Sequence, residues 1–240
     1  MRKRIDGLVM MGTRIMGTHR EVATGKQVFV PVIITDVKHN NGTMYKTILI
    51  DPPWQHAAGG SRGADKKYPL MKMEEILALP IQKLAHPDGA HLYLWTINNS
   101  MQDAFKCLEA WEFDYVTMIT WMKSGKPGIG QYFRGITEHC LFATTKKKLP
   151  YKIIDSRRQQ GVTGFMAERR EHSAKPEQMR MMIERVSYPP YVELFARRLV
   201  NGWTVCGNEV NRTLQSVLRG ECADYHPTLF DESKLTKAIS

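Results

Sequence analysis

The sequence predicts an α/β fold with a mostly parallel central sheet and helices on both faces. Apolar runs typical of buried strands alternate along the chain with segments whose apolar residues repeat at helical spacing, and this alternation favours a layered α/β arrangement. Acidic, amide or aromatic residues stand where several of the runs end: Asp36, Asp51, Trp95, Trp121 and Asn208. Because the carboxyl ends of parallel strands share one edge of the sheet, where ligands bind, we expect these residues to line one site.

Strands are predicted from short runs rich in β-branched and aromatic residues. They are expected over residues 28–35, 45–50, 91–95, 115–121, 138–144, 191–195 and 202–206. Between them, Gly-rich, Pro-rich or aperiodic segments indicate loops over residues 56–67, 125–135 and 157–174.

Helix start signals lie between these strands. Ser100 and Asp103 form a capping-box pattern, and apolar residues at helical spacing follow it. Pro176 suits the first turn of a second helix, and a closing helix is expected over residues 208–218. We therefore expect one domain over residues 28–220, preceded by an extension (1–27) of unassigned role and followed by a tail (221–240).

The charge of the chain indicates a polyanionic partner. The 240 residues carry a net charge of +10, and residues 146–198 hold 13 Lys and Arg against six acids, or +7. Nucleic acid is the simplest partner for such a surface, although a basic surface without a partner is the alternative. The expected nucleic-acid contacts are Lys123, Arg134, Lys146, Lys147, Lys148, Arg157, Arg158, Arg169 and Arg170.

Cysteine usage and hydropathy predict a cytoplasmic location, in the host cytoplasm if the chain is viral. The four cysteines lie far apart in the sequence without the close pairing of a zinc site, so we expect reduced, mostly buried thiols and no metal. No run approaches the roughly 20 apolar residues of a membrane span, and the N-terminus does not form a convincing signal peptide.

The most informative segment is Asp51-Pro52-Pro53-Trp54, which directly follows the strand over residues 45–50. The N6 amine of adenine is a poor nucleophile because its lone pair is delocalised into the ring. A carboxylate and a backbone carbonyl that accept its two N–H bonds favour the pyramidal form, whose lone pair can attack. The prolines stiffen the turn, and the aromatic residue can stack on a base. The alternative is an ordinary Asp-Pro turn at a strand end.

Further motifs follow this tetrapeptide in order. They are Tyr68-Pro69-Leu70-Met71, His91-Leu92-Tyr93-Leu94-Trp95, Ile119-Thr120-Trp121-Met122-Lys123, Glu138-His139-Cys140-Leu141, Glu171-His172-Ser173-Ala174-Lys175-Pro176-Glu177, Glu193-Leu194-Phe195-Ala196-Arg197, and Gly202-Trp203 with Gly207-Asn208-Glu209. In this order the segments resemble the MT-A70 family of S-adenosylmethionine-dependent adenine-N6 methyltransferases, of the small prokaryotic or viral type. The resemblance spans about residues 33–215.

The resemblance implies a Rossmann-like methyltransferase fold in permuted order, with the amine-reacting motif before most of the cofactor half. It implies a catalytic role for Asp51, Pro52, Pro53 and Trp54. Tyr68, Trp95 and Trp121 would form or gate the base pocket, with the alternative that they are ordinary loop or core aromatics. S-adenosylmethionine would be held by Asp36, Asp51, Lys175, Phe195, Arg197, Asn208 and Glu209; strand-end turns, surface ion pairs and helix capping are the alternatives for several of them.

The function expected on this basis is adenine-N6 methylation of nucleic acid, with DNA favoured over RNA. A catalytically silent, nucleic-acid-binding partner subunit is one alternative. Methylation of another planar amine, such as cytosine N4, is a second. Relatives often act as dimers, so a homodimer is among the expected partners, and no membrane is.

Overall fold

The computed structural model of the chain describes residues 14–20, 27–33, 44–55, 70–128, 132–169, 174–207, 210 and 213–218. The first two segments are β1 (Arg14–Arg20) and β2 (Gln27–Ile33), which pair antiparallel in a sheet of their own. The predicted boundary between residues 27 and 28 therefore falls inside a hairpin.

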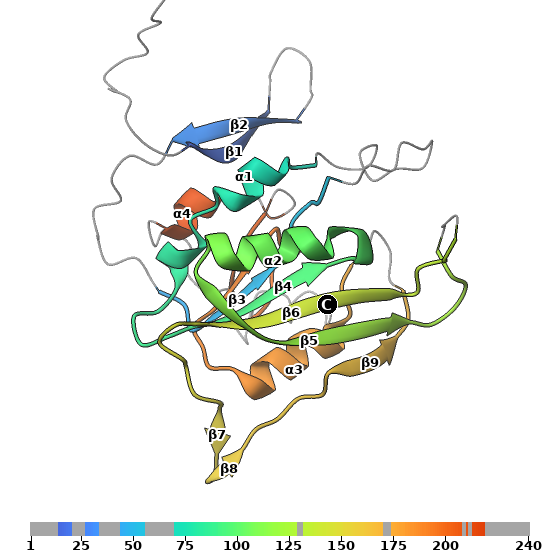
Figure 1. The fold of residues 1–240 in the computed structure, drawn as a ribbon. Helices are drawn as coiled ribbons and strands as arrows, with labels where there is room; N and C mark the ends of the chain where they lie inside the picture. The colour runs from blue at the N-terminus through green and yellow to red at the C-terminus, as the bar shows by residue number, and fades with distance from the viewer. Residues whose placement is uncertain are drawn as a thin grey trace, which may run out of the picture.

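Seven strands form the central sheet, in the order β11-β10-β3-β4-β6-β5-β9. Figure 1 labels the strands from β3 to β9 in this order. One half is parallel: β3 (Thr47–Ile50) lies between β10 (Tyr191–Leu194) and β4 (His91–Thr96), and β11 (Trp203–Cys206) flanks β10. All four residues of β3 are buried. A strand covered on both faces reads as a continuous apolar run, which is why this strand was visible in the sequence.

The other half of the sheet reverses direction. β6 (Thr137–Thr145) runs antiparallel to both β4 and β5 (Phe113–Lys123), and β9 (Gly164–Ala167) pairs parallel with β5 at the edge. Four of the six neighbouring pairs are parallel, which confirms the mostly parallel sheet. The reversal brings the start of β6 and the end of β5 to the edge where β3 and β4 end.

Helices cover both faces of the sheet, as predicted. α1 (Met73–Leu77), α2 (Met101–Ala110) and α4 (Leu214–Leu218) pack on one face, and α3 (Glu177–Val186) packs on the other (Figure 1). Two short 3-10 helices, η2 (Ile81–Leu84) and η3 (Asn98–Ser100), precede β4 and α2.

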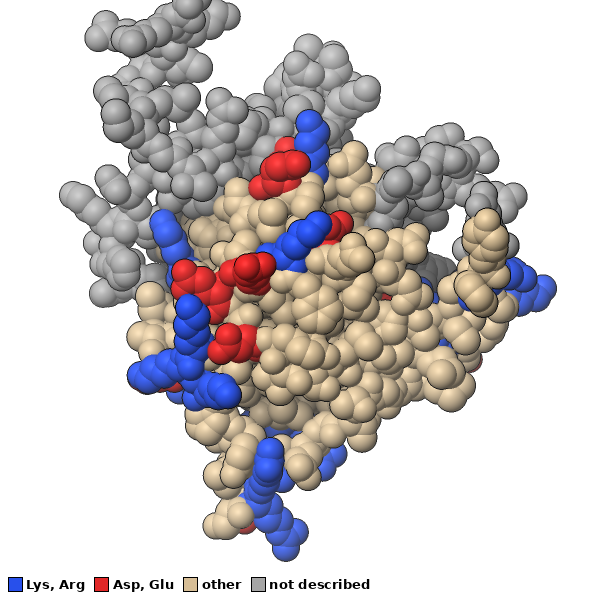
Figure 2. All heavy atoms as spheres, viewed as in Figure 1, with Lys and Arg blue, Asp and Glu red and all other residues tan. Residues whose placement is uncertain are grey.

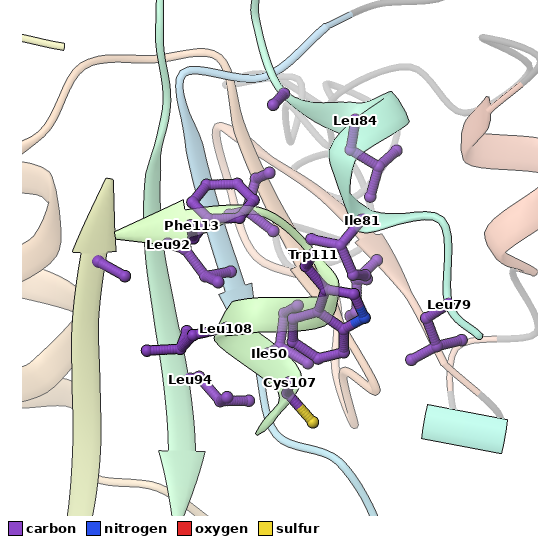
Figure 3. Close-up of a cluster of buried hydrophobic side chains, with 14 of the residues drawn as sticks. Ile50, Leu79, Ile81, Leu84, Leu92, Leu94, Cys107, Leu108, Trp111 and Phe113 are labelled. Carbon is purple, nitrogen blue, oxygen red and sulfur yellow. The ribbon is translucent and has the colours of Figure 1, made fainter. Parts of the chain in front are cut away.

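The larger core cluster joins the α2 face to the sheet (Figure 3). Ile50, Leu92 and Leu94 from the strands meet Leu108 of α2 there, and Trp111 lies 2% exposed among them. Burial of a large aromatic ring contributes several kcal/mol when its neighbours cannot collapse into the space it leaves, roughly 3–5 kcal/mol by core truncation.

Three sequence predictions need correction. Residues 157–174 are not one loop, because they include β8 (Arg157–Arg158) and β9; β8 pairs antiparallel with β7 (Ile153–Ile154). Ser100 precedes α2 but makes no side-chain cap hydrogen bond, and Asp103 instead pairs with Lys106 at 2.9 Å. The described part of the closing helix begins at Leu214. Strands of two to four residues lack the period that reveals longer elements.

Cys107, Cys140 and Cys206 are buried, as predicted, whereas Cys222 lies outside the described residues. Among the described helices, none has the length and apolar character that crossing a membrane requires.

We expect Trp111→Ala to lower the free energy of unfolding by about 3–5 kcal/mol, because the ring leaves a cavity that the surrounding strands cannot fill. Urea unfolding followed by circular dichroism measures the change. Tyr132→Ala is the matched control: its ring is 92% exposed, and its loss should cost less than about 0.5 kcal/mol. Equal losses for the two variants would contradict this account of the core.

Candidate active site

The carboxyl edge of the sheet collects the acidic and basic residues that follow or begin its central strands. Asp51 follows β3, Glu138 stands at the second position of β6, and Lys123 ends β5. Lys175 approaches from the segment before α3. These four residues come from four distant parts of the sequence, and the sheet topology brings them together.

Their side chains form a chain of alternating charge. Lys175 Nζ donates to Asp51 Oδ2 at 2.6 Å and lies 3.4 Å from Glu138 Oε2. The other Glu138 oxygen, Oε1, accepts a hydrogen bond from Lys123 Nζ. The side chains of Lys175, Asp51 and Glu138 are 20%, 25% and 11% exposed, so the group has only partial access to water.

The pKa shifts show that attraction between these opposite charges outweighs the effect of burial. Burial alone would raise the pKa of Glu138, but Lys175 and Lys123 outweigh it, and the pKa lies below its ordinary value. Burial alone would lower the pKa of Lys175, but Asp51 and Glu138 outweigh it, and that pKa lies above its ordinary value. Both groups are therefore held in their charged forms around neutral pH.

The tetrapeptide after β3 forms a tight turn. The Trp54 backbone N–H donates to the Pro52 carbonyl at 2.9 Å, and the Met71 N–H donates to the Pro53 carbonyl at 3.0 Å. Trp54 and Met71 form a parallel bridge, which holds the end of the described stretch 44–55 beside the start of the stretch 70–128. The Pro52 carbonyl keeps one lone pair for a second donor.

Three tryptophans form the wall beneath these charges. Trp54 is 5% exposed, and its indole N–H donates to the Trp95 carbonyl at 3.0 Å. The rings of Trp95 and Trp121 meet edge to face, with centroids 6.3 Å apart. Lys175 Nζ lies 5.4 Å from the Trp95 ring centroid and Lys123 Nζ lies 5.0 Å from that of Trp121, within the range of cation–π attraction.

The strand beside β3 contributes a second charged group. Glu193 of β10 pairs with Arg180 Nη2 of α3 at 2.5 Å. Burial raises the pKa of Glu193 and Asp51 raises it further, against the opposing effect of Arg180. The next turn holds Phe195 at a φ of 63°, a strained conformation for a non-glycine residue, and Arg197 follows it half-buried.

Backbone crowding explains a glycine near this turn. A Cβ on Gly207 would lie 2.2 Å from the Ala196 carbonyl oxygen, so only glycine lets the end of β11 pass this close to the segment after β10. Asn208 and Glu209 follow Gly207, but they lie outside the described residues, as do Asp36, Tyr68 and Arg170. Their predicted roles stay predictions.

The predicted nucleic-acid contacts divide between two ends of the molecule. Arg134 and Arg169 lie exposed near the carboxyl edge: Arg134 donates to the carbonyls of Pro127 and Gly128, and Arg169 to that of Gly135. Lys123 faces Glu138 in the site, with a side chain only 17% exposed.

The remaining basic residues lie toward the other end of the sheet. Lys146, Lys147 and Lys148 follow the end of β6, and Arg157 and Arg158 form β8. β6 has nine residues, which at about 3.4 Å per residue span roughly 27 Å, so the three lysines cannot contact the phosphates beside a base held at Asp51. Lys147 pairs instead with Asp88 at 3.1 Å.

Glu138 is a residue of the site that sequence reasoning did not assign a role. The sequence does mark Glu138, as an acidic residue inside an apolar strand, directly before His139 and Cys140. A charged residue in a buried run usually has a partner, but the partners, Lys123 and Lys175, could be identified only once the direction of β6 was known.

The fold places the chain among the α/β proteins with a Rossmann-like sheet. Proteins of this class bind ligands at the carboxyl ends of the strands, which is the edge where the charged residues gather. Within that class, a family model described as MT-A70 matches residues 45–209. The chain belongs to the MT-A70 family.

Relatives of known description span a wide size range. The chain is 28% identical over 201 residues to a "Probable N(6)-adenosine-methyltransferase MT-A70-like" of Oryza sativa subsp. japonica, covering 80% of this chain and 26% of that protein. It is 27% identical over 190 residues to the "Type II methyltransferase M.MunI" of Mycoplasma sp, covering 69% of this chain and 78% of that protein. It is also 28% identical over 109 residues to the "N6-adenosine-methyltransferase non-catalytic subunit MTB" of Arabidopsis thaliana, covering 42% and 14%. The chain thus spans about a quarter of the rice relative.

We expect Glu138→Gln to reduce stability in a pH-dependent way. The folded-state pKa of Glu138 lies below its ordinary value of 4.5, so its ionic contribution is complete above that value and is lost as pH falls through the folded-state pKa. The difference in free energy of unfolding between wild type and variant should therefore shrink between about pH 6 and pH 3. Urea unfolding over that range measures it. Glu74→Gln, an exposed carboxyl on α1, is the control; a difference for Glu138→Gln that stays constant with pH would refute the assignment.

Proposed function

We propose that this protein transfers a methyl group from S-adenosylmethionine to the N6 amine of adenine in nucleic acid, with DNA favoured over RNA. The observation that carries the proposal is the Asp51 carboxylate at the end of β3, held by Lys175 Nζ at 2.6 Å beside a proline turn. It presents two acceptors on adjacent residues, the Asp51 side chain and the Pro52 carbonyl.

These two acceptors position the N6 amine of the adenine. Each takes one N–H of the amine, which favours the pyramidal nitrogen and directs its lone pair away from the ring. Asp51 Oδ2 is already bound by Lys175, so Oδ1 is the oxygen left for the substrate. After transfer the nitrogen is strongly acidic and its proton can leave to water, so Asp51 need not serve as a lasting proton acceptor. Alignment for one in-line displacement is then the main contribution of the protein.

The charges at the edge fit the amino-acid end of S-adenosylmethionine. Glu138 Oε2 is buried, and Lys175 Nζ lies 3.4 Å from it, beyond good hydrogen-bond geometry. This oxygen can therefore accept from a ligand ammonium, and Lys175 can pair with a ligand carboxylate. The turn of Phe195 and Arg197 lies beside Asp51 on the neighbouring strand. When bound, this cofactor supplies a methyl group on a sulfonium, which is already electrophilic and needs no acid to activate it.

The aromatic wall and the basic rim suit a base presented from nucleic acid. A target adenine in a duplex must leave the stack to reach Asp51. Trp95 and Trp121 are 1% and 2% exposed, so they lie behind the site and do not contact the base directly. They pack against Lys175 and Lys123, which lie over their rings. Arg134 and Arg169 lie where flanking phosphates would pass.

The relatives support the activity and leave an alternative. One relative is named a probable N(6)-adenosine methyltransferase, and the chain matches most of a protein named a type II methyltransferase; both names support methyl transfer. The similarity to a subunit named non-catalytic favours, as the second candidate, a silent nucleic-acid-binding partner subunit. The intact Asp51–Lys175 pair argues against it. A homodimer is proposed from the family resemblance alone.

We expect Asp51→Asn to lower methyl transfer by about 10²–10³-fold, the range for loss of one group that hydrogen-bonds the reacting atoms in the transition state. Labelled methyl transfer from S-adenosylmethionine to duplex DNA, single-stranded DNA and RNA, followed by nucleoside digestion, measures the rate and identifies the product. The control is Asp103→Asn on the exposed side of α2, which should keep full activity.

Three outcomes separate the candidates. N6-methyladenine from one substrate, lost in Asp51→Asn, supports the proposed activity. Methylcytosine as the product would replace it with the other amine chemistry. No transfer to any substrate by a folded protein that still binds nucleic acid would support the silent subunit.

A further inference from the structure

A small β-hairpin projects from the body of the protein at the foot of Figure 1. It consists of β7 and β8, joined by Asp155 and Ser156. Both turn residues have positive φ values, 49° and 61°, as a two-residue type I′ turn requires. The turn matches the natural twist of paired strands, so the hairpin is a preformed ribbon.

Each face of the ribbon carries one isoleucine and one arginine. Ile153 pairs with Arg158, and Ile154 pairs with Arg157; because successive side chains point to opposite faces, the two pairs lie on opposite sides. The isoleucines are 52% and 45% exposed. The Arg158 guanidinium lies 4.0 Å from the Tyr151 ring centroid, which restricts its orientation. Figure 2 shows basic side chains at this foot of the molecule.

The base of the ribbon is fixed to the end of α3. The Lys152 N–H donates to the Val186 carbonyl at 3.2 Å, Lys152 Nζ donates to the Glu184 carbonyl at 2.7 Å, and the Ile153 N–H donates to the Tyr188 hydroxyl at 3.1 Å. α3 begins two residues after Lys175. Its ten residues span about 15 Å, and the ribbon adds several more, so the turn lies roughly 20–25 Å from the candidate active site.

A continuous strip of chain joins the ribbon to that site. The Val162 N–H contacts the Met182 sulfur of α3 at 3.4 Å, and the Thr163 carbonyl accepts from the Thr120 N–H at 2.8 Å. β9 then follows the sheet edge until the Ala167 carbonyl accepts from the Trp121 indole at 3.0 Å. Val162 and Met166 face outward along it, 61% and 68% exposed, and Arg169 lies at its upper end.

We propose that the β7–β8 ribbon enters the major groove of duplex DNA about six or seven base pairs from the target adenine, at about 3.4 Å per base pair. This inference rests on the proposed function. The major groove of B-form DNA admits a two-stranded ribbon. Arg157 and Arg158 contact the phosphates that border the groove, and Ile153 and Ile154 contact thymine methyl groups. The narrow major groove of A-form RNA excludes the same insertion.

Binding to a mixed-sequence DNA duplex of about 30 base pairs tests the proposal independently of catalysis, with the dissociation constant measured against salt. Arg157→Gln with Arg158→Gln should weaken binding about tenfold or more. It should also reduce the slope of log affinity against log salt by about 1.8, because each phosphate contact contributes about 0.9. The matched control removes two exposed charges far from the ribbon, Lys83 of η2 and Lys106 of α2. The double variant Lys83→Gln with Lys106→Gln should leave the salt slope unchanged.

A second variant separates groove insertion from phosphate contact. Ile153→Thr with Ile154→Thr keeps the charge and the β propensity of the ribbon. It should weaken DNA binding several-fold with an unchanged salt slope, and neither double variant should alter binding to an RNA duplex of the same length.

The competing results are distinct. A salt slope unaffected by loss of both arginines overturns the proposal, as does an equal loss of binding to duplex RNA. A change in oligomeric state on gel filtration, with DNA binding intact, would assign the ribbon to a protein partner and overturn it as well. Methyl transfer to a duplex ending about four base pairs from the adenine, which lies short of the ribbon at about 3.4 Å per pair, reports on the proposed function alone. Its failure would not be confused with the failure of the ribbon.

Discussion

The candidate site depends on Lys175, a cation placed between two carboxylates that come from different strands. Asp51 follows β3 and Glu138 lies in β6, with β4 between them in the sheet. Two acids at the same partly buried edge would repel each other and lose hydration, and burial would raise the pKa of Glu138. Lys175, with Lys123 on the far side, reverses that shift. The segment before α3 is thereby tied to the sheet by charge as well as by packing.

The backbone is also unusual at this edge of the sheet. Phe195 adopts a positive φ immediately after β10, and Gly207 admits the Ala196 carbonyl where no Cβ would fit. Phe195 follows β10, the strand next to β3, and Gly207 follows β11 on the other side of β10. Strained backbone of this kind persists where the surrounding structure fixes it, and it gathers at functional sites.

The sequence predicted six of the seven strands of the central sheet, but not β9, the β7–β8 hairpin or β1, and not how the charges are distributed in space. Buried parallel strands such as β3 are continuous apolar runs, and residues after them must lie at the carboxyl edge, so Asp51 and Trp95 were accessible to sequence reasoning. The direction of β6 was not. That direction puts Glu138 and Lys146 at opposite ends of one strand, so a basic segment that is continuous in sequence divides into two surfaces. The hairpin at residues 153–158 is too short to carry any periodic signal.

The residues around Asp51 fix the positions of two hydrogen-bond acceptors, which gives a reason for the two prolines and the buried tryptophan of this turn. An amine with two N–H bonds needs two acceptors at a fixed separation, and a free aspartate side chain would sample several rotamers. Lys175 holds one carboxylate oxygen, while the Trp54 N–H holds the Pro52 carbonyl from one side. Trp54 is itself fixed by its indole bond to Trp95. Each acceptor keeps a free lone pair, so under the proposed function the substrate amine would meet acceptors whose positions are already fixed by folding.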